Sequence, residues 1–243
     1  MPRIDSLYQL IERKKQEKGR ALKIICDWDD TIQSYQPTVL YELVKRVKDN
    51  PINFEIFFKC WATDIDVIKE KDEFYNQAPF IDTADELLLA IKKNLVSELI
   101  FLSYFNKRRF PNGDARKEKK FQRTFGKLSQ QVKVEMKLIS SLNKPQWILE
   151  NHSDFDIFID DLPKTISESV EKFPADKIFV MPDQELNFGA KCERIESDNI
   201  YHLQVGVSSL KDENFEAFQN MIINEIEYES KIIYIDGYRG KIN

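Results

Sequence analysis

Four aspartates follow two short apolar runs that lie far apart in the sequence. The runs occupy residues 21–26 and 155–159 and are rich in β-branched or aromatic side chains, which is typical of buried parallel strands. The four acids are Asp27, Asp29, Asp160 and Asp161. Because ligands of open α/β sheets bind outside the carboxyl ends of the strands, we expect these side chains to meet. Crowded carboxylates repel each other unless a cation lies between them, and Mg²⁺ prefers oxygen ligands, so the pattern predicts a magnesium site.

Two more polar residues are placed to act beside these acids. Ser103 follows a third apolar run, 98–102, and Lys144 precedes Pro145 in an expected turn just after another strand. A hydroxyl and an ammonium group offer a hydrogen-bond donor and positive charge to a phosphoryl group. Taken singly, each of these residues is more often a turn former, a helix cap or a surface residue. Their joint occurrence at the ends of strands favours phosphoryl chemistry.

Composition excludes several other classes of protein. The chain has 243 residues with 42% hydrophobic and 12% aromatic side chains, enough to bury a core and too many for a disordered chain. Its three cysteines are far apart and it has only two histidines, so neither a disulfide framework, a paired-cysteine zinc site nor a multi-histidine metal site is indicated. No apolar run is long enough to cross a membrane and no signal peptide is recognisable, so we expect a soluble cytoplasmic protein without a membrane partner.

A basic run between residues 107 and 127 stands out against the net charge of -5, which itself disfavours a general nucleic-acid binder. The run holds nine lysines and arginines against two acids. Of three interpretations of this run, we favour a solvated helix face. A rim that attracts phosphate is the second choice and a nucleic-acid surface is the third.

Strands alternate with helices along the chain, which predicts a three-layer, Rossmann-like α/β fold: a parallel sheet with helices on both faces. Helical stripes between residues 33 and 79 predict an inserted helical cap, leaving 1–32 and 80–243 as the α/β core. Thr83 and Glu86 have the spacing of a capping box at the start of a core helix, and Ile4 to Ile11 have the period of an N-terminal helix. The absence of a GxGxxG segment disfavours a Rossmann-type nucleotide cofactor.

The polar residues also resemble the four motifs of the haloacid dehalogenase superfamily, over roughly residues 21–182. In that family an apolar strand ends in two aspartates one residue apart, followed by threonine or valine, and a C1 cap, often helical, is inserted after this first motif. The matching segments, in motif order, are Ile25 to Ile32, Ser103, Lys144 with Pro145, and Asp160 with Asp161.

The resemblance implies a role for each matched residue. Asp27 would be the nucleophile that takes the phosphoryl group. Asp29 would protonate the leaving oxygen and then activate water. Thr31 would brace the loop and Ser103 would hydrogen-bond a phosphoryl oxygen.

The resemblance also implies a counter-charge and a cofactor. Lys144 would neutralise charge on the phosphoryl group and on the nucleophile, with the strand residue Lys137 as a rival for this role. Mg²⁺ would be held by the carboxylates of Asp27, Asp160 and Asp161 together with the backbone carbonyl of Asp29.

The function that we expect is that of a Mg²⁺-dependent phosphatase, a phosphoric monoester hydrolase that acts on a small phosphorylated metabolite through an aspartyl-phosphate intermediate. One alternative is a phosphatase for nucleotides or nucleic-acid ends that uses the basic segment 107–127. A second alternative is a binding protein with this fold and no turnover. The substrate and the oligomeric state stay open.

Overall fold

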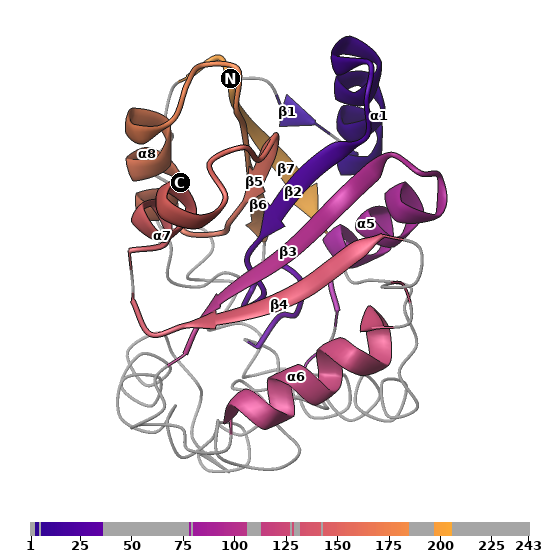
Figure 1. Cartoon of the computed structure of the whole chain (residues 1–243), viewed down its shortest axis with the longest axis vertical. Helices are drawn as coiled ribbons and strands as arrows, with labels where there is room; N and C mark the ends of the chain where they lie inside the picture. The colour runs from indigo at the N-terminus through magenta and orange to yellow at the C-terminus, as the bar shows by residue number, and fades with distance from the viewer. Residues whose placement is uncertain are drawn as a thin grey trace, which may run out of the picture.

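The computed structural model describes residues 3–4, 6–35, 78, 80–105, 113–126, 128, 132–141, 143–184 and 197–205. In this part of the chain seven strands form one all-parallel sheet in the order β1-β7-β6-β5-β2-β3-β4 (Figure 1). The strands are β1 (Arg3–Ile4), β2 (Leu22–Cys26), β3 (Val96–Tyr104), β4 (Lys133–Ile139), β5 (Ile157–Ile159), β6 (Ile178–Gln184) and β7 (Ile200–Val205).

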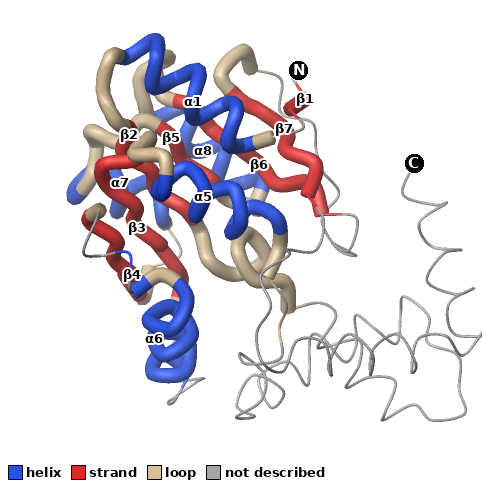
Figure 2. The backbone as a smooth tube through the Cα atoms, turned by 90° about the vertical axis from the view of Figure 1, so that its right-hand side faces the viewer, coloured by secondary structure: helices blue, strands red, loops and turns tan. Residues whose placement is uncertain are grey.

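Helices cover both faces of this sheet, as Figures 1 and 2 show. They are α1 (Leu7–Lys18), α5 (Asp82–Lys92), α6 (Gly113–Thr124), α7 (Lys144–Asn151) and α8 (Pro163–Lys172). Side chains alternate across β2: Ile24 packs in one apolar cluster with α1, α5 and α6, and Ile25 packs in a second cluster with α7 and α8. The predicted three-layer α/β fold with a parallel sheet is therefore confirmed.

The strand order brings the ends of β2 and β5 together. β2 lies between β3 and β5, so the chain moves outward in one direction through β3 and β4 and in the other through β6 and β7. The amide of Asp27 donates to the carbonyl of Ile159 over 2.8 Å, and the amide of Asp160 donates to Val180 over 3.1 Å. The residues that follow these strands thus share one edge of the sheet, at the switch point where ligands of such sheets bind.

The predicted helical cap, 33–79, lies almost wholly outside the described residues and stays a prediction. Its two ends are described and lie side by side. Gln33 is fully buried and forms bridges with Asp29 and Phe80, and its side-chain amide donates to the carbonyl of Ala78 over 2.8 Å. Any insertion between these ends therefore leaves and re-enters the core beside Asp29.

The prediction of a capping box at Thr83 and Glu86 is wrong, because these residues do not cap the helix that contains them. Helix α5 begins at Asp82, and Ile81, the residue at its cap, makes no side-chain cap hydrogen bond. Glu86 instead caps a different helix, α1, because its carboxylate accepts from the Ser6 hydroxyl over 2.8 Å and from the amide of Tyr8 over 2.5 Å. The carboxylate thus satisfies one of the backbone amides that α1 leaves open at its N-terminus, that of Tyr8.

The edge strand β1 also differs from expectation. Ile4, expected in the N-terminal helix, lies in β1 and pairs with Leu203 of β7.

No helix of the described residues is long and apolar enough to span a membrane.

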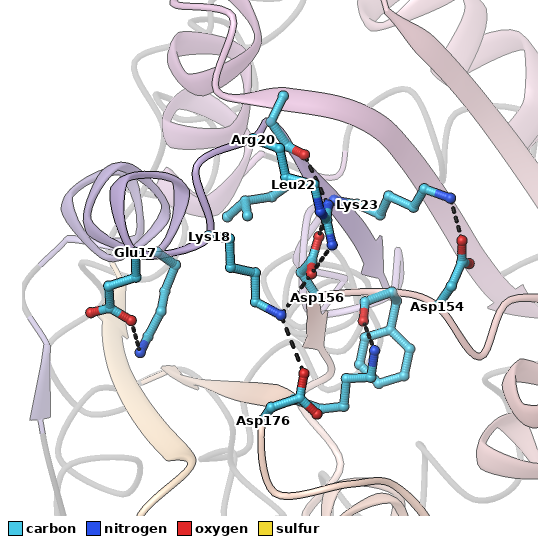
Figure 3. A network of polar contacts seen from close by, with 12 residues as sticks. Glu17, Lys18, Arg20, Leu22, Lys23, Asp154, Asp156 and Asp176 are labelled. Atoms are coloured by element: carbon cyan, nitrogen blue, oxygen red, sulfur yellow. Dashed lines mark hydrogen bonds and ion pairs between the residues drawn. The ribbon is translucent and has the colours of Figure 1, made fainter.

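A polar network ties together the amino ends of β2 and β5, at the opposite edge from the four aspartates (Figure 3). Asp156 is 1% exposed and accepts two hydrogen bonds from Arg20, each 2.8 Å long. It also accepts from the amide of Lys23 over 2.8 Å and pairs with Lys18 at 3.0 Å. Lys18 and Arg20 flank the end of α1, so this network fixes α1 against the sheet.

Candidate active site

Three buried carboxylates meet where β2 and β5 end. Asp27, Asp160 and Asp161 each offer an oxygen atom, and these atoms all lie within 4.8 Å of one another. The three side chains come from the loops directly after the two neighbouring strands, as the sequence predicts. Carboxylate oxygens at this spacing match the ligands that a hard divalent cation such as Mg²⁺ prefers.

Lys144 supplies a positive charge to this cluster. Its ammonium nitrogen lies 2.8 Å from Asp27 Oδ1 and 2.7 Å from Asp160 Oδ2, and the residue is 4% exposed. Lys144 is the first residue of α7 and does not directly follow a strand, since β4 ends at Ile139. Asn143 caps that helix by accepting from the amide of Gln146 over 3.0 Å, which holds the first turn in place.

The rival lysine lies elsewhere. Lys137 of β4 pairs with Glu135 at 2.6 Å, and its side chain is 42% exposed. Of the two lysines, the structure therefore brings only Lys144 to the carboxylates.

Burial and mutual repulsion dominate the electrostatics of the cluster. Loss of water raises the pKa of Asp27 to about 7, since Lys144 opposes this shift only in part and Asp160 and Asp29 add to it. Desolvation and then Asp160 hold the pKa of Asp161 well above its usual range. The pKa of Lys144 is raised, because Asp160 and Asp27 outweigh the desolvation that opposes its charge. The raised pKa values of Asp27 and Asp161 show that burial and the repulsion between carboxylates disfavour the ionised forms. A divalent cation bound between the carboxylates would offset this repulsion, so the cluster fits such a cation.

Thr31 connects the two loops that carry the cluster. Its hydroxyl accepts from the amide of Asp161 over 3.2 Å and donates to Asp161 Oδ1 over 3.4 Å. Between the strand and Thr31, Asp30 has a left-handed backbone with φ of 55°, and its carboxylate accepts from the amide of Tyr35 over 3.0 Å. Asp tolerates this conformation through such local hydrogen bonds.

The thiol of Cys26 lies beside Asp27 but is poorly suited to act as a nucleophile. Cys26 is fully buried, and desolvation raises the pKa of its thiol well above the usual range. The thiol donates to the carbonyl of Asp27 over 3.2 Å. Because the thiolate is the reactive form, this cysteine fits a structural place in β2.

Asp29 and Ser103 form a second polar group with a lysine that the sequence analysis missed. Ser103 is fully buried in β3, and its hydroxyl donates to Asp29 Oδ2 over 3.4 Å. Lys117 of α6 places its ammonium nitrogen 2.7 Å from Asp29 Oδ1, 2.7 Å from Asp29 Oδ2 and 2.8 Å from Ser103 Oγ. The carboxylate of Asp29 does not belong to the group of three that could share an ion, so its expected metal contact, through the backbone carbonyl, stays a prediction.

The basic run is less exposed than a solvated helix face. Among its described residues, Lys117 and Lys120 are 1% and 2% exposed. Lys117 lies four residues, about one helical turn, before Phe121, and both Phe121 and Phe125 are themselves buried. The 3.6-residue period therefore assigns Lys117 to the buried face of α6, and this signal could identify Lys117 from the sequence.

Trp28 holds α6 over the site. Its ring makes edge-to-face contacts with Phe80, Phe101, Phe121 and Phe125, at centroid distances between 5.2 and 6.3 Å. Its indole nitrogen donates to Gln33 Oε1 over 3.1 Å. The residue between Asp27 and Asp29 thus packs against the helix that carries Lys117.

The fold and the site together define an α/β protein with carboxylates and lysines gathered at the carboxyl edge of a parallel sheet. No protein-family model matches the sequence, and no curated protein matches it. The chain is similar to the solved structure of a hydrolase of the haloacid dehalogenase superfamily from Ehrlichia chaffeensis, with 14% identity and a TM-score of 0.41 over 86% of this chain and 99% of that one.

Two further solved structures are similar to the chain. One is described as a haloacid dehalogenase-like hydrolase from Burkholderia xenovorans LB400, with 12% identity and a TM-score of 0.41 over 75% of this chain and 92% of that one. The other is described as the hydrolase YfnB of the same superfamily from Bacillus subtilis, bound to magnesium, with 12% identity and a TM-score of 0.42 over 75% of this chain and 94% of that one.

Proposed function

We propose that this protein is a Mg²⁺-dependent phosphohydrolase that cleaves a phosphate monoester through an aspartyl-phosphate on Asp27. The proposal depends above all on one observation. Asp27 Oδ1 lies 2.8 Å from the buried ammonium group of Lys144, and Asp27 shares a possible cation site with Asp160 and Asp161.

Asp27 is suited to attack a phosphorus atom. It is 3% exposed, so the carboxylate has lost the water that would otherwise stabilise it and weaken its reactivity. In the first step a carboxylate oxygen of Asp27 forms a bond to phosphorus and the bond from phosphorus to the leaving oxygen breaks. In the second step water attacks the same phosphorus atom, which releases inorganic phosphate and restores the carboxylate.

Asp29 is suited to move the protons of both steps. Its side chain is 29% exposed, in contrast to the buried Asp27 only two residues away. It would donate a proton to the leaving oxygen in the first step and take a proton from water in the second.

The positive charges of the site and the Ser103 hydroxyl would bind the phosphoryl oxygens. The ammonium group of Lys144 already contacts Asp27 and would accompany the phosphoryl group as it is transferred, and the Ser103 hydroxyl would donate to one of its oxygens. A bound Mg²⁺, held by Asp27, Asp160 and Asp161, would neutralise charge on the phosphoryl group.

The substrate class that we propose is a small phosphorylated metabolite. The burial of Lys117 and Lys120 removes two cations of the basic segment from the surface that a nucleic acid would contact. Within the described residues no observation favours a nucleic-acid substrate or a binding protein without turnover.

The test is hydrolysis of para-nitrophenyl phosphate with Mg²⁺ and with EDTA, by the wild-type protein and by Asp27→Asn. We expect turnover that requires Mg²⁺ and that is lost in Asp27→Asn, since an amide does not replace the nucleophile. Asp154→Asn is the matched control, because Asp154 is exposed at the opposite edge of the sheet, where it pairs with Lys23. Equal activity of Asp27→Asn and the wild type would contradict the proposal.

A further inference from the structure

Lys117 is a second buried lysine at the site, and no motif of the sequence accounts for it. Its ammonium nitrogen is equally distant, 2.7 Å, from the two carboxylate oxygens of Asp29, and 2.8 Å from the Ser103 hydroxyl oxygen. Its side chain is 2% exposed, whereas the side chain of Asp29 is 29% exposed. The buried ammonium group of Lys117 therefore contacts the Asp29 carboxylate from the protein interior, while part of the Asp29 side chain remains accessible to solvent.

We propose that Lys117 is a positioning residue for phosphoryl transfer, which fixes the Asp29 carboxylate and the Ser103 hydroxyl in one orientation beside Asp27. This inference rests on the proposed function, because it assigns to Lys117 an effect on the proton transfer by Asp29. An ammonium group that contacts both oxygens prevents the carboxylate from rotating, so one oxygen keeps facing the leaving group. Such alignment contributes to the rate when the proton must move as the bond breaks.

Anchoring of α6 does not by itself explain a lysine at this position. Phe121 and Phe125 are buried on the same face of the helix and pack against Trp28. Removing an ammonium group from water is unfavourable unless charged or polar partners compensate, and an apolar side chain of similar length avoids that cost. Its contacts with Asp29 and Ser103, two residues of the proposed reaction, favour a role of Lys117 in that reaction.

Lys120 offers a matched comparison on the same helix. It is 2% exposed, but its ammonium nitrogen lies 4.9 Å from the centre of the Phe80 ring, a cation–π contact. Replacing Lys117 or Lys120 by methionine removes one buried charge from the same face of α6 in each case. Only the first replacement removes a contact with Asp29 and Ser103.

The readout is the dependence of the rate on the leaving group. Para-nitrophenolate leaves readily without a proton, whereas phenolate is a poorer leaving group that gains more from general-acid catalysis. We therefore compare kcat/KM, which reports on the steps up to leaving-group departure, for para-nitrophenyl phosphate and phenyl phosphate. A substitution that only disturbs the fold lowers both values equally.

We expect Lys117→Met to lower kcat/KM about 30-fold for phenyl phosphate and about threefold for para-nitrophenyl phosphate, within the range of general-acid effects. Asp29→Asn should show the same selectivity. Adding Lys117→Met to Asp29→Asn should lower the remaining activity by about twofold or less, because residues that act through one another are not additive. Lys120→Met should change both rates equally and by little.

The outcomes separate the two proposals. If the wild type with Mg²⁺ hydrolyses neither ester, the proposed function is wrong, and the inference falls with it. If the wild type is active but Lys117→Met loses the same factor on both esters, Lys117 has only a structural role and the inference alone is wrong. Thermal unfolding of each variant checks folding, and if Lys117→Met does not fold, Lys117→Gln takes its place with the same two deciding outcomes.

Discussion

Lys144 Nζ lies 2.8 Å from Asp27 Oδ1, so the first residue of α7 supplies the counter-charge to the residue that follows β2. The same nitrogen lies 2.7 Å from Asp160 Oδ2. Helix α7 is therefore joined to both central strands through one buried ammonium group. In the absence of a divalent cation, the ammonium group of Lys144 is the positive charge that stabilises the ionised forms of Asp27 and Asp160.

Lys144→Met should reduce both activity and stability. Turnover of para-nitrophenyl phosphate should fall by about 100-fold, as for other losses of a charged group that stabilises the transferred phosphoryl group. In EDTA the free energy of unfolding should fall by about 3 kcal/mol, since two buried carboxylates lose their cationic partner. Urea unfolding with and without Mg²⁺ measures this, and Mg²⁺ should recover more stability in the variant than in the wild type.

Lys137→Met is the control for this prediction. Lys137 is exposed and pairs with Glu135 on the surface of β4, so its loss should change stability by less than about 1 kcal/mol and leave turnover unchanged. A variant of Lys137 as inactive as Lys144→Met would reverse the assignment of the two lysines.

The sequence predicts the central part of the fold because an aspartate directly follows each of the strands β2 and β5. β2 and β5 are buried on both faces, so their apolar runs stop where the chain leaves the sheet, at Asp27 and Asp160. Parallel pairing then brings these ends together without any further information. For the same reason, the predicted meeting of these aspartates depends only on local patterns and on one general property of α/β sheets.

Contacts over a long sequence distance are where the prediction is incomplete. The local pattern predicts that Glu86 caps its own helix, but Glu86 contacts Ser6 and Tyr8, which are 80 and 78 residues away. The basic run predicts a solvated helix face that includes Lys117, but Lys117 contacts Asp29, 88 residues away. A charged side chain is normally placed in water by its type alone, and only the position of Phe121 on the same face indicated that Lys117 is buried.

The raised pKa of Asp27 predicts how the stability of the metal-free protein depends on pH. Burial raises this pKa from 3.8 to about 7, so between these values the folded protein binds a proton that the unfolded chain releases. The stability from this group is fully present below pH 3.8 and is lost as the pH rises to about 7. Asp27→Asn removes this loss, since an amide does not titrate.

Thermal unfolding in EDTA across this pH range tests the prediction. The melting temperature of Asp27→Asn, relative to that of the wild type, should rise between pH 4 and about 7 and stay constant above it. A difference that does not depend on pH would show that the Asp27 carboxyl ionises as readily in the folded protein as in the unfolded chain. Added Mg²⁺ should reduce the difference, because the cation replaces the proton.

Asp156 and Asp154 make a matched pair at the opposite edge of the sheet (Figure 3). Asp156 is buried and holds Arg20, Lys18 and the amide of Lys23, so Asp156→Asn should lower the free energy of unfolding by about 3 kcal/mol. Asp154→Asn, whose side chain is 65% exposed, should lower it by less than about 1 kcal/mol. Both variants, when folded, should keep the turnover of the wild type. Urea unfolding measures the difference, and equal losses in the two variants would show that the network contributes no more than a surface ion pair.

Thr31 should affect Mg²⁺ affinity although its side chain is not one of the proposed ligands. Thr31→Val keeps the shape of the side chain but removes both hydrogen bonds with Asp161, so the Asp161 carboxylate becomes free to turn away from the ion. Loss of such an outer contact lowers metal affinity by about 10-fold in comparable sites. Titration with Mg²⁺, followed by calorimetry or by the rise in melting temperature, gives the affinity.

Thr83→Val is the control, because Thr83 is equally buried and its hydroxyl has no hydrogen-bond partner among the described residues. That variant should bind Mg²⁺ as the wild type does, whereas unchanged affinity in Thr31→Val would mean that Asp161 keeps its orientation without the threonine.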